Sequence, residues 1–596
     1  MTSSNNIRYL PVAFGVKRSK PHGKQVLNLL FSIVVFLLFI AFFILMGIAA
    51  EQMSAPLSEL RVNPISLEYV NLLEYSLRTF FRMLIALGCS VIFALLYATL
   101  AAKNRYTEQI LIPLLDILQS VPVLGYISFT ATGFLALFPG EVIGAECTAI
   151  FAIFTSQVWN MAFSFYQSLK SLPVELREVA SMFKMSRWQK FWQVEVAYGI
   201  PGLVYNMSIS MAGGWFFVVA SEAITVGNTK ITLPGIGSYI AMALVQHDVM
   251  ALVYAIIAMA IVILFYDQLL LRPLTVWSSR FHYDMVPGKE APKSYILYLI
   301  QKNIFIKAIL YPFSVLAWWM RELSKKISLK FVRQSNNENF WHKPPAPGTA
   351  DFLPYIWYLL LFSAALYSGY RVFDFLNDSI GWQEVRKVLG LSLITMLRVI
   401  VLVLLASIIW VPLGIYIGIN PNIAKIVQPM AQFLAAFPVN LLFPVAVIII
   451  SHYHLNPDVW LSILMIIGTQ WYILFNVIAG SSSFPNDLRE VSEGLHVKGL
   501  VWWQKVMLPA IMPYLVTGCI TASGGAWNAS IVAEIVNFGD QQIIAHGIGS
   551  YITQMTIAAD FPKIVLGVGM MSLLIVVFNR IFWQPLYDYI TKRFQL

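Results

Sequence analysis

Long apolar runs dominate this chain and decide its fold class. A helix needs about 20 apolar residues to cross the hydrocarbon core of a bilayer, and that rule divides the chain into two sets of six runs. The first set lies near 26–49, 78–101, 110–137, 143–168, 200–225 and 250–271, and the second near 353–370, 391–417, 424–450, 459–480, 510–536 and 562–583. The sequence therefore predicts an all-α polytopic membrane protein with about twelve transmembrane helices.

The composition agrees with a membrane protein and excludes other classes. Only 12% of the 596 residues are charged, about half the share in soluble domains. The 58% hydrophobic content also excludes a disordered chain. Three cysteines in 596 residues are too few for a disulfide scaffold, and we interpret them as buried thiols.

The net charge of +10 indicates orientation rather than nucleic-acid binding. Residues 1–25 carry five Lys or Arg and no acid, whereas 51–75 carry four Glu and one Arg. Since Lys and Arg gather on cytoplasmic loops, we expect the N-terminus, the C-terminus and the loops 170–199, 272–350 and 481–509 to be cytoplasmic. Within 272–350, the stretch 295–320 is interrupted by Lys302 and Lys307, so we expect an interfacial helix there. The bilayer is the expected partner of the whole chain, and we expect no nucleic acid.

The two sets of spans are copies of each other. Arg82 aligns with Arg398 at an offset of 316, and Glu222 aligns with Glu534 at an offset of 312. At the second offset, Gly235-Ile236-Gly237-Ser238-Tyr239-Ile240 matches residues 547–552 at every position. An even number of spans gives both copies the same orientation, so an axis along the membrane normal should relate them. We divide the chain into a basic N-terminus (1–25), a first half (26–278), a linker with the interfacial helix (279–350) and a second half (351–596).

One cytoplasmic loop recurs in both halves, between the fourth and fifth spans. Each copy contains Leu-Arg-Glu-Val, at 176–179 and 488–491, in a short amphipathic stretch. These loops resemble the EAA loop (E-A-A-x3-G-x9-I-x-L-P) of ABC importer permeases of the type I fold. The matching triplets are Glu178-Val179-Ala180 and Glu490-Val491-Ser492. Lys184 and His496 replace the usual glycine. The closing Leu-Pro is kept as Leu508-Pro509 but lost in the first half.

The resemblance is greatest to the nitrate/sulfonate/taurine branch of these permeases, because the third-span prolines and the Gly-Ile-Gly-Ser-Tyr-Ile runs match it. It implies a permease with two fused halves in the inner membrane of a bacterial cell. It also implies two partner ATP-binding cassette subunits and an extracytoplasmic solute-binding protein. The implied solute is a small anion such as nitrate, sulfonate, taurine or bicarbonate. The implied ATPase-coupling residues are Arg177, Glu178, Val179, Ala180, Lys184, Arg489, Glu490, Val491, Ser492 and His496.

The chain itself is not expected to be an enzyme or to bind a cofactor. It has no G-x-x-x-x-G-K-[ST] phosphate loop, since Gly23-Lys24 and Gly288-Lys289 are followed by Gln25 and Glu290. ATP and Mg²⁺ should therefore bind to the partner subunit. We expect no catalytic residues and no metal site; His452 and His454 have a metal-like spacing, but a solvated loop is the favoured interpretation.

Four residues in the fifth spans are candidates for the transport pathway: Trp215, Glu222, Trp527 and Glu534. Acids within a span are costly, so Glu222 and Glu534 are either paired gate groups or carboxylates capped by a neighbouring helix's backbone or hydroxyl. The tryptophans lie on the same helix face seven residues earlier and either line the pathway or pack in the core. For Arg82 and Arg398, snorkelling to headgroups is favoured over attraction of an anion.

Other functional classes remain as alternatives. A fused iron(III)- or thiamine-type permease also has joined halves, but matches less well at the Gly-Ile-Gly-Ser-Tyr-Ile runs. A six-plus-six secondary transporter would carry its charged motif between its second and third spans, where this chain has Ala-Lys-Asn-Arg-Tyr. An intramembrane enzyme is disfavoured because H-E-x-x-H and G-x-S-x-G are absent from the sequence.

Overall fold

A computed structural model describes residues 65–281 without 184, 227 and 228; 294–303; and 380–593 without 483, 485, 539 and 540; together with single residues within 33–44, 311–319 and 359–374. The chain divides into two compact units, one of Met1–Gly47 with Ser294–Gln334 and one of Ile48–Lys293 with Ser335–Leu596. In the smaller unit, α13 (Tyr295–Lys302) begins at Ser294, whose side chain accepts a hydrogen bond from the Leu297 backbone N–H. Most of the remaining interfacial stretch, and the 1–25 segment, lie outside the described residues.

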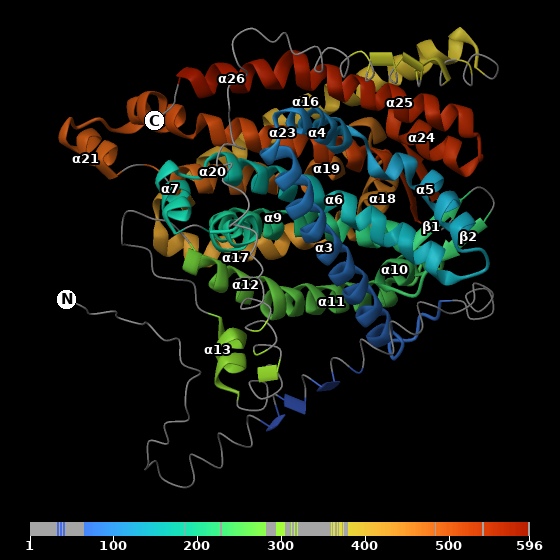
Figure 1. The fold of residues 1–596 in the computed structure, drawn as a ribbon. Helices are drawn as coiled ribbons and strands as arrows, with labels where there is room; N and C mark the ends of the chain where they lie inside the picture. The colour runs from blue at the N-terminus through green and yellow to red at the C-terminus, as the bar shows by residue number, and fades with distance from the viewer. Residues whose placement is uncertain are drawn as a thin grey trace, which may run out of the picture. The chain divides into compact units, whose positions relative to one another are not determined.

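The larger unit contains the first permease half as a series of helices (Figure 1). In order they are α3 (Leu72–Lys103), α4 (Arg105–Ser120), α5 (Val123–Leu137), α6 (Val142–Lys170), α7 (Val174–Met182), α8 (Arg187–Lys190), the π-turn Phe191–Glu195, α9 (Val196–Glu222), β1 (Ala223–Val226), β2 (Thr229–Thr232), α10 (Ile236–Val245), α11 (Val249–Tyr266), the π-turn Asp267–Leu271, α12 (Arg272–Ser278) and the 3₁₀ turn Ser279–Phe281. Helices α3, α6 and α9 pack together as its core.

The second half follows the same order in the same unit. Its elements are α16 (Trp382–Ile419), α17 (Pro421–Ala436), η4 (Val439–Leu442), α18 (Phe443–His452), α19 (Pro457–Ile467), α20 (Trp471–Ser482), α21 (Asn486–Gly494), α22 (Gly499–Trp502), the π-turn Trp503–Met507, α23 (Leu508–Ala533), β3 (Ile535–Phe538), β4 (Gln541–Ile544), α24 (Ile548–Ile557), α25 (Phe561–Phe578), the π-turn Asn579–Trp583 and α26 (Gln584–Arg593). Both π-turns of the first half recur in the second half at an offset of 312 residues. The internal duplication therefore includes these local irregularities of the helices.

The helices agree with an all-α polytopic protein, but some predicted spans are not single helices. Among the described residues, seven helices are long and apolar enough to cross a membrane, or up to nine if each of two bent pairs is one span. The predicted spans 110–137 and 424–450 are broken at Pro122 and Pro438, and the second break bends the chain by 74°. Proline has no N–H to donate and disfavours helical geometry in the residue before it. The spans 26–49 and 353–370 lie largely outside the described residues.

Two short antiparallel hairpins add to the predicted helices. Strand β1 pairs with β2, with Ala223 opposite Thr232, and β3 pairs with β4, with Ile535 opposite Ile544. Each hairpin follows the fifth-span helix of its half, and β-branched residues are frequent in both. Figure 1 shows β1, β2, α10 and α24 toward one end of the larger unit, and α7 and α21 toward the opposite end.

The two halves contact each other through helices of the larger unit. Helix α9 of the first half packs on α17 of the second, and α5 packs on α23. At the second contact, the Val123 backbone N–H donates to Asn528 Oδ1 at 2.9 Å. The fifth-span helix of each half therefore packs on a helix of the other half's third span, as expected for two domains that flank a pathway.

Candidate functional site

The first repeated loop forms an exposed helix. Helix α7 begins after Pro173 and carries Arg177, Glu178 and Val179 on its exposed surface. Ala180, by contrast, is only 2% exposed. The helix is thus anchored by one small side chain while its Arg and Glu face outward.

The second repeated loop places its matching residues in the same way. On α21, Glu490 and Val491 are exposed, and Ser492, which is equivalent to Ala180, is buried. Arg489 lies on the same helix. The two loops therefore present the same face of the same short helix to the exterior.

Both loop helices end with the same hydrogen bond. The Met185 N–H donates to the Ala180 carbonyl at 3.1 Å, and the Val497 N–H donates to the Ser492 carbonyl at 3.0 Å. At the position where the family motif has glycine, His496 adopts a φ of 54°. This is the left-handed region that glycine occupies at least cost, so the backbone keeps the motif's geometry although the side chain differs. Lys184 lies outside the described residues.

Large apolar side chains project from both loops. Met182 is 80% exposed and Phe183 73% in the first loop, and Leu495 is 71% and Leu500 73% in the second. Exposed apolar groups next to charged ones are typical of a surface that binds another protein.

Glu222 lies in a buried network rather than in an open channel. Its carboxylate accepts hydrogen bonds from Thr79 Oγ1 at 2.6 Å, from the Gly237 N–H at 2.6 Å and from Arg82 Nη1 at 2.7 Å. Both Glu222 and Arg82 are fully buried. The Arg82 guanidinium also holds Glu146 through two hydrogen bonds, of 2.5 and 2.7 Å. The snorkelling predicted for Arg82 is therefore wrong, because two buried carboxylates hold its guanidinium inside the protein.

The Gly-Ile-Gly-Ser-Tyr-Ile run of the first half takes part in this network. It forms the first turn of α10, and Ser238 Oγ also donates to the Glu222 carbonyl at 2.6 Å. A Cβ atom at Gly235 would overlap the Glu222 carboxylate. The glycine lets the α10 N-terminus approach a buried negative charge, which N-terminal N–H groups stabilise.

The second half repeats this network with one difference. Glu534 accepts from Thr395 Oγ1 at 2.7 Å and from the Gly549 N–H at 2.8 Å, and Arg398 Nη1 lies 3.2 Å away. Arg398 also donates to Asp458, at 2.7 Å, whereas Arg82 holds a glutamate. The Asp458 side chain is 35% exposed and also accepts from the backbone N–H of His546, at 2.7 Å. The network is thus closed in the first half and reaches the surface in the second.

These positions bear on the alternatives for the four fifth-span candidates. Glu222 and Glu534 lie in separate networks, each within its own half. Each is capped by backbone and hydroxyl donors, which is the geometry expected for capped carboxylates rather than for paired gate groups. Trp215 and Trp527 are 2% and 1% exposed. The Trp215 ring packs edge-on against Tyr266, with centroids 5.5 Å apart. The arrangement is that of a packed core, and a gate role for these residues stays a prediction.

Sequence reasoning missed Thr79, Thr395, Glu146 and Asp458. The internal repeat could have pointed to these four residues. Thr79 and Thr395 occupy equivalent positions at the offset of 316, and Glu146 and Asp458 occupy equivalent positions at the offset of 312. Glu146 also lies inside a predicted span, where an acid is costly without a partner.

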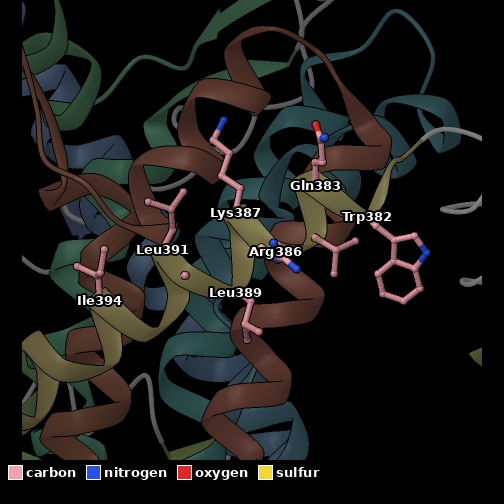
Figure 2. Close-up of a pocket in the computed structure, with 9 residues that line it drawn as sticks. Trp382, Gln383, Arg386, Lys387, Leu389, Leu391 and Ile394 are labelled. Atoms are coloured by element: carbon pink, nitrogen blue, oxygen red, sulfur yellow. The ribbon is translucent and has the colours of Figure 1, made fainter.

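Two cavities among the described residues bear on the candidate sites. One, of about 850 Å³, is lined by Trp382, Arg386, Lys387 and six further residues, all on the first turns of α16 (Figure 2). None of the predicted site residues lines it. The other, of about 50 Å³, lies between the two halves and is lined by α9 together with helices of the second half. No group of three or more His, Cys, Asp or Glu residues among those described is placed to hold a metal ion.

Comparison with known proteins identifies the family. The family model described as "binding-protein-dependent transport system inner membrane component" matches twice, over residues 89–270 and 410–593. The chain belongs to this family, with two permease domains fused in one polypeptide.

Several curated relatives are similar to one of these domains. The chain is 31% identical over 174 residues to the bicarbonate transport system permease protein CmpB of Synechococcus elongatus, which covers 29% of this chain and 59% of the relative. It is 31% identical over 182 residues to the nitrate import permease protein NrtB of Leptolyngbya laminosa, covering 30% and 61%. It is 28% identical over 169 residues to the glycine betaine/carnitine transport permease protein GbuB of Listeria monocytogenes, covering 28% and 54%. The matched segments span little more than half the length of these relatives.

Proposed function

We propose that this chain supplies both transmembrane halves of an ATP-driven importer, and that the two halves together form the solute pathway. The observation that supports this most is the pair of exposed loop helices, α7 and α21. They present equivalent Glu178 and Glu490 at the same end of the larger unit. Two equivalent surfaces on one chain suit two ATP-binding subunits, each of which would seat one helix.

The partners and orientation follow from the same proposal. The loop helices lie in segments that the distribution of Lys and Arg predicts to be cytoplasmic, so the ATP-binding subunits and both termini would be cytoplasmic. ATP and Mg²⁺ would bind to those subunits. An extracytoplasmic solute-binding protein would deliver solute near the hairpins and α10 and α24. The membrane would be the inner membrane of a bacterial cell.

We further propose that the solute is a small oxyanion, with bicarbonate and nitrate as the first candidates. This rests on the printed names of CmpB and NrtB, each 31% identical to part of the chain. Sulfonates, and taurine through its sulfonate group, remain further candidates.

The test is ATP hydrolysis by the reconstituted complex. The double variant Glu178→Ala/Glu490→Ala should insert normally but lose solute-stimulated hydrolysis and uptake, because each loop loses its outward carboxylate. Asp588→Ala is the matched control, since Asp588 is an exposed carboxylate on α26, outside both loops, and it should behave as the unmodified protein. Unchanged stimulated hydrolysis in the double variant would refute the coupling role of the loops.

A further inference from the structure

The 50 Å³ cavity between the halves lies at two helix breaks of the second half. Phe437 and Val439 flank the break at Pro438, and Gly468 and Thr469 form the 43° bend between α19 and α20; all four line the cavity. Interrupted helices in transporters release backbone groups at the substrate site. The two irregularities of the second half therefore converge on the same space.

The cavity also lies at the depth expected for a substrate site. Gly213, Thr469 and Gly525 line it, and each falls near the middle of a predicted span (200–225, 459–480 and 510–536). Transporters hold their solute near the bilayer midplane, at the interface of their repeats. A single water needs about 10–15 Å³ of such volume, so this space suits a few waters or one very small solute.

Neutral hydrogen-bond donors provide the polar part of the wall. They are the hydroxyls of Tyr472 and Thr469. The Asn528 amide also lines the cavity, but its Oδ1 accepts from the Val123 N–H at 2.9 Å and its Nδ2 donates to the Gly524 carbonyl at 3.3 Å. The tyrosine hydroxyl packs directly against Gly213, because a Cβ on Gly213 would lie only 2.9 Å from Tyr472 Oη. Thr469 Oγ1 makes only long contacts, of 3.3 and 3.4 Å, to carbonyls of its own helix. These donors can thus turn to a solute at little cost.

No Lys, Arg, Asp or Glu is among the lining residues. The polar contacts to an anion here would come from the neutral hydroxyls of Tyr472 and Thr469. Such a site binds weakly, which suits transit, because conduction needs binding that is easily reversed.

The first half does not duplicate this wall. Asn160, equivalent to Tyr472, already accepts from Gln119 Nε2 and donates to Ser210 Oγ, both at 3.4 Å. Gln157, equivalent to Thr469, is fully buried against the sulfur atoms of Met83 and Met211. The pathway is therefore asymmetric although the fold is repeated.

We infer that Tyr472 and Thr469 of the second half form a transit site for a small planar oxyanion, beside Gly213 of the first half. This inference rests on the proposed importer function and assigns its solute to one half of the pathway. The remaining lining, including Phe216 and Phe437, would exclude bulk water from the site.

The test is uptake of nitrate and of bicarbonate by proteoliposomes that contain the full chain, its ATP-binding subunits and its binding protein. Tyr472→Phe and Thr469→Val each remove one donor at almost constant volume. Each should lower kcat/KM for uptake by about 3–10-fold, the range expected for one neutral hydrogen bond. The matched control is Tyr266→Phe, which removes a buried hydroxyl that does not line the cavity and should change uptake less than twofold.

The outcomes separate this inference from the function it rests on. If the unmodified complex takes up neither anion, both the proposed solute class and the transit site are overturned. If it takes up either anion and the Tyr472 and Thr469 variants keep its kinetics, or Tyr266→Phe loses as much as they do, only the transit site is overturned.

Discussion

Removing Arg82 should destabilise the protein far more than removing its repeat partner Arg398. The substitution Arg82→Met keeps the length of the side chain but leaves Glu146 and Glu222 without their shared cation. Those carboxylates are 2% and 0% exposed, so neither can recover its hydration in the folded state. Breaking a buried pair in this way costs about 3–5 kcal/mol.

Arg398→Met is the matched comparison within the same chain. Its partner Asp458 is 35% exposed and keeps its bond to the His546 N–H, while Glu534 keeps Thr395 and two backbone donors. The expected loss is therefore about 1–3 kcal/mol, the cost of weakened hydrogen bonding to one buried group.

The assay is thermal unfolding of each purified variant in the same detergent, followed by loss of the monodisperse peak in size-exclusion chromatography. On a scale of about 2–4 °C per kcal/mol for a domain the size of one half, Arg82→Met should lower Tm by roughly 10 °C and Arg398→Met by clearly less. Equal losses in the two variants, or an unchanged Tm for Arg82→Met, would show that the buried network does not stabilise the first half as argued.

Three further predictions concern the loops, the glycines and the topology. His496→Val should destabilise the α21 loop by about 1 kcal/mol relative to His496→Gly, since a β-branched residue fits the left-handed φ poorly. The measurement is amide hydrogen exchange over 486–497, which should be faster in the Val variant. Identical exchange in the two variants would contradict the prediction. Gly235→Ala should lower Tm because its new Cβ would overlap the Glu222 carboxylate. Gly140→Ala is the comparison: no atom lies within 4 Å of its new Cβ, so it should lower Tm only through the positive φ of this residue. A smaller drop in Tm for Gly235→Ala than for Gly140→Ala would contradict the predicted overlap. A tag inserted near residue 340 should react with a labelling reagent only from the cytoplasmic side. Labelling from outside would mean that the predicted orientation of the second half is inverted.

The duplication was the part of the fold most accessible from the sequence. Arg82 and Arg398, or Glu222 and Glu534, are rare charges in apolar runs and recur at fixed offsets, so their importance could be seen. Their pairing could not, because Arg82 lies 140 positions before Glu222, and hydropathy carries no information about which helices touch. For the same reason Arg82 was predicted to reach headgroups.

The helix breaks were also invisible to a count of apolar residues. The run 424–450 is mostly apolar, so it was interpreted as one span although Pro438 stands in its middle. The bend at 468–470 has no proline and depends on tertiary packing. The 50 Å³ cavity depends on both bends, and only coordinates could place Tyr472 against Gly213.

The loop motif shows the opposite relation between sequence and structure. His496 departs from the family's glycine, yet its φ of 54° and the Val497 to Ser492 hydrogen bond retain the expected turn. A mismatch in residue type therefore did not mean a mismatch in backbone, because histidine tolerates the left-handed region better than β-branched residues do.

The most direct test of the central claim, that one chain supplies both halves of an importer permease, is the native mass of the assembled transporter. The account predicts one copy of this chain with two ATP-binding subunits, since α7 and α21 provide one docking helix each. A complex with two copies of this chain for two ATP-binding subunits, or one copy with a single subunit, would contradict it.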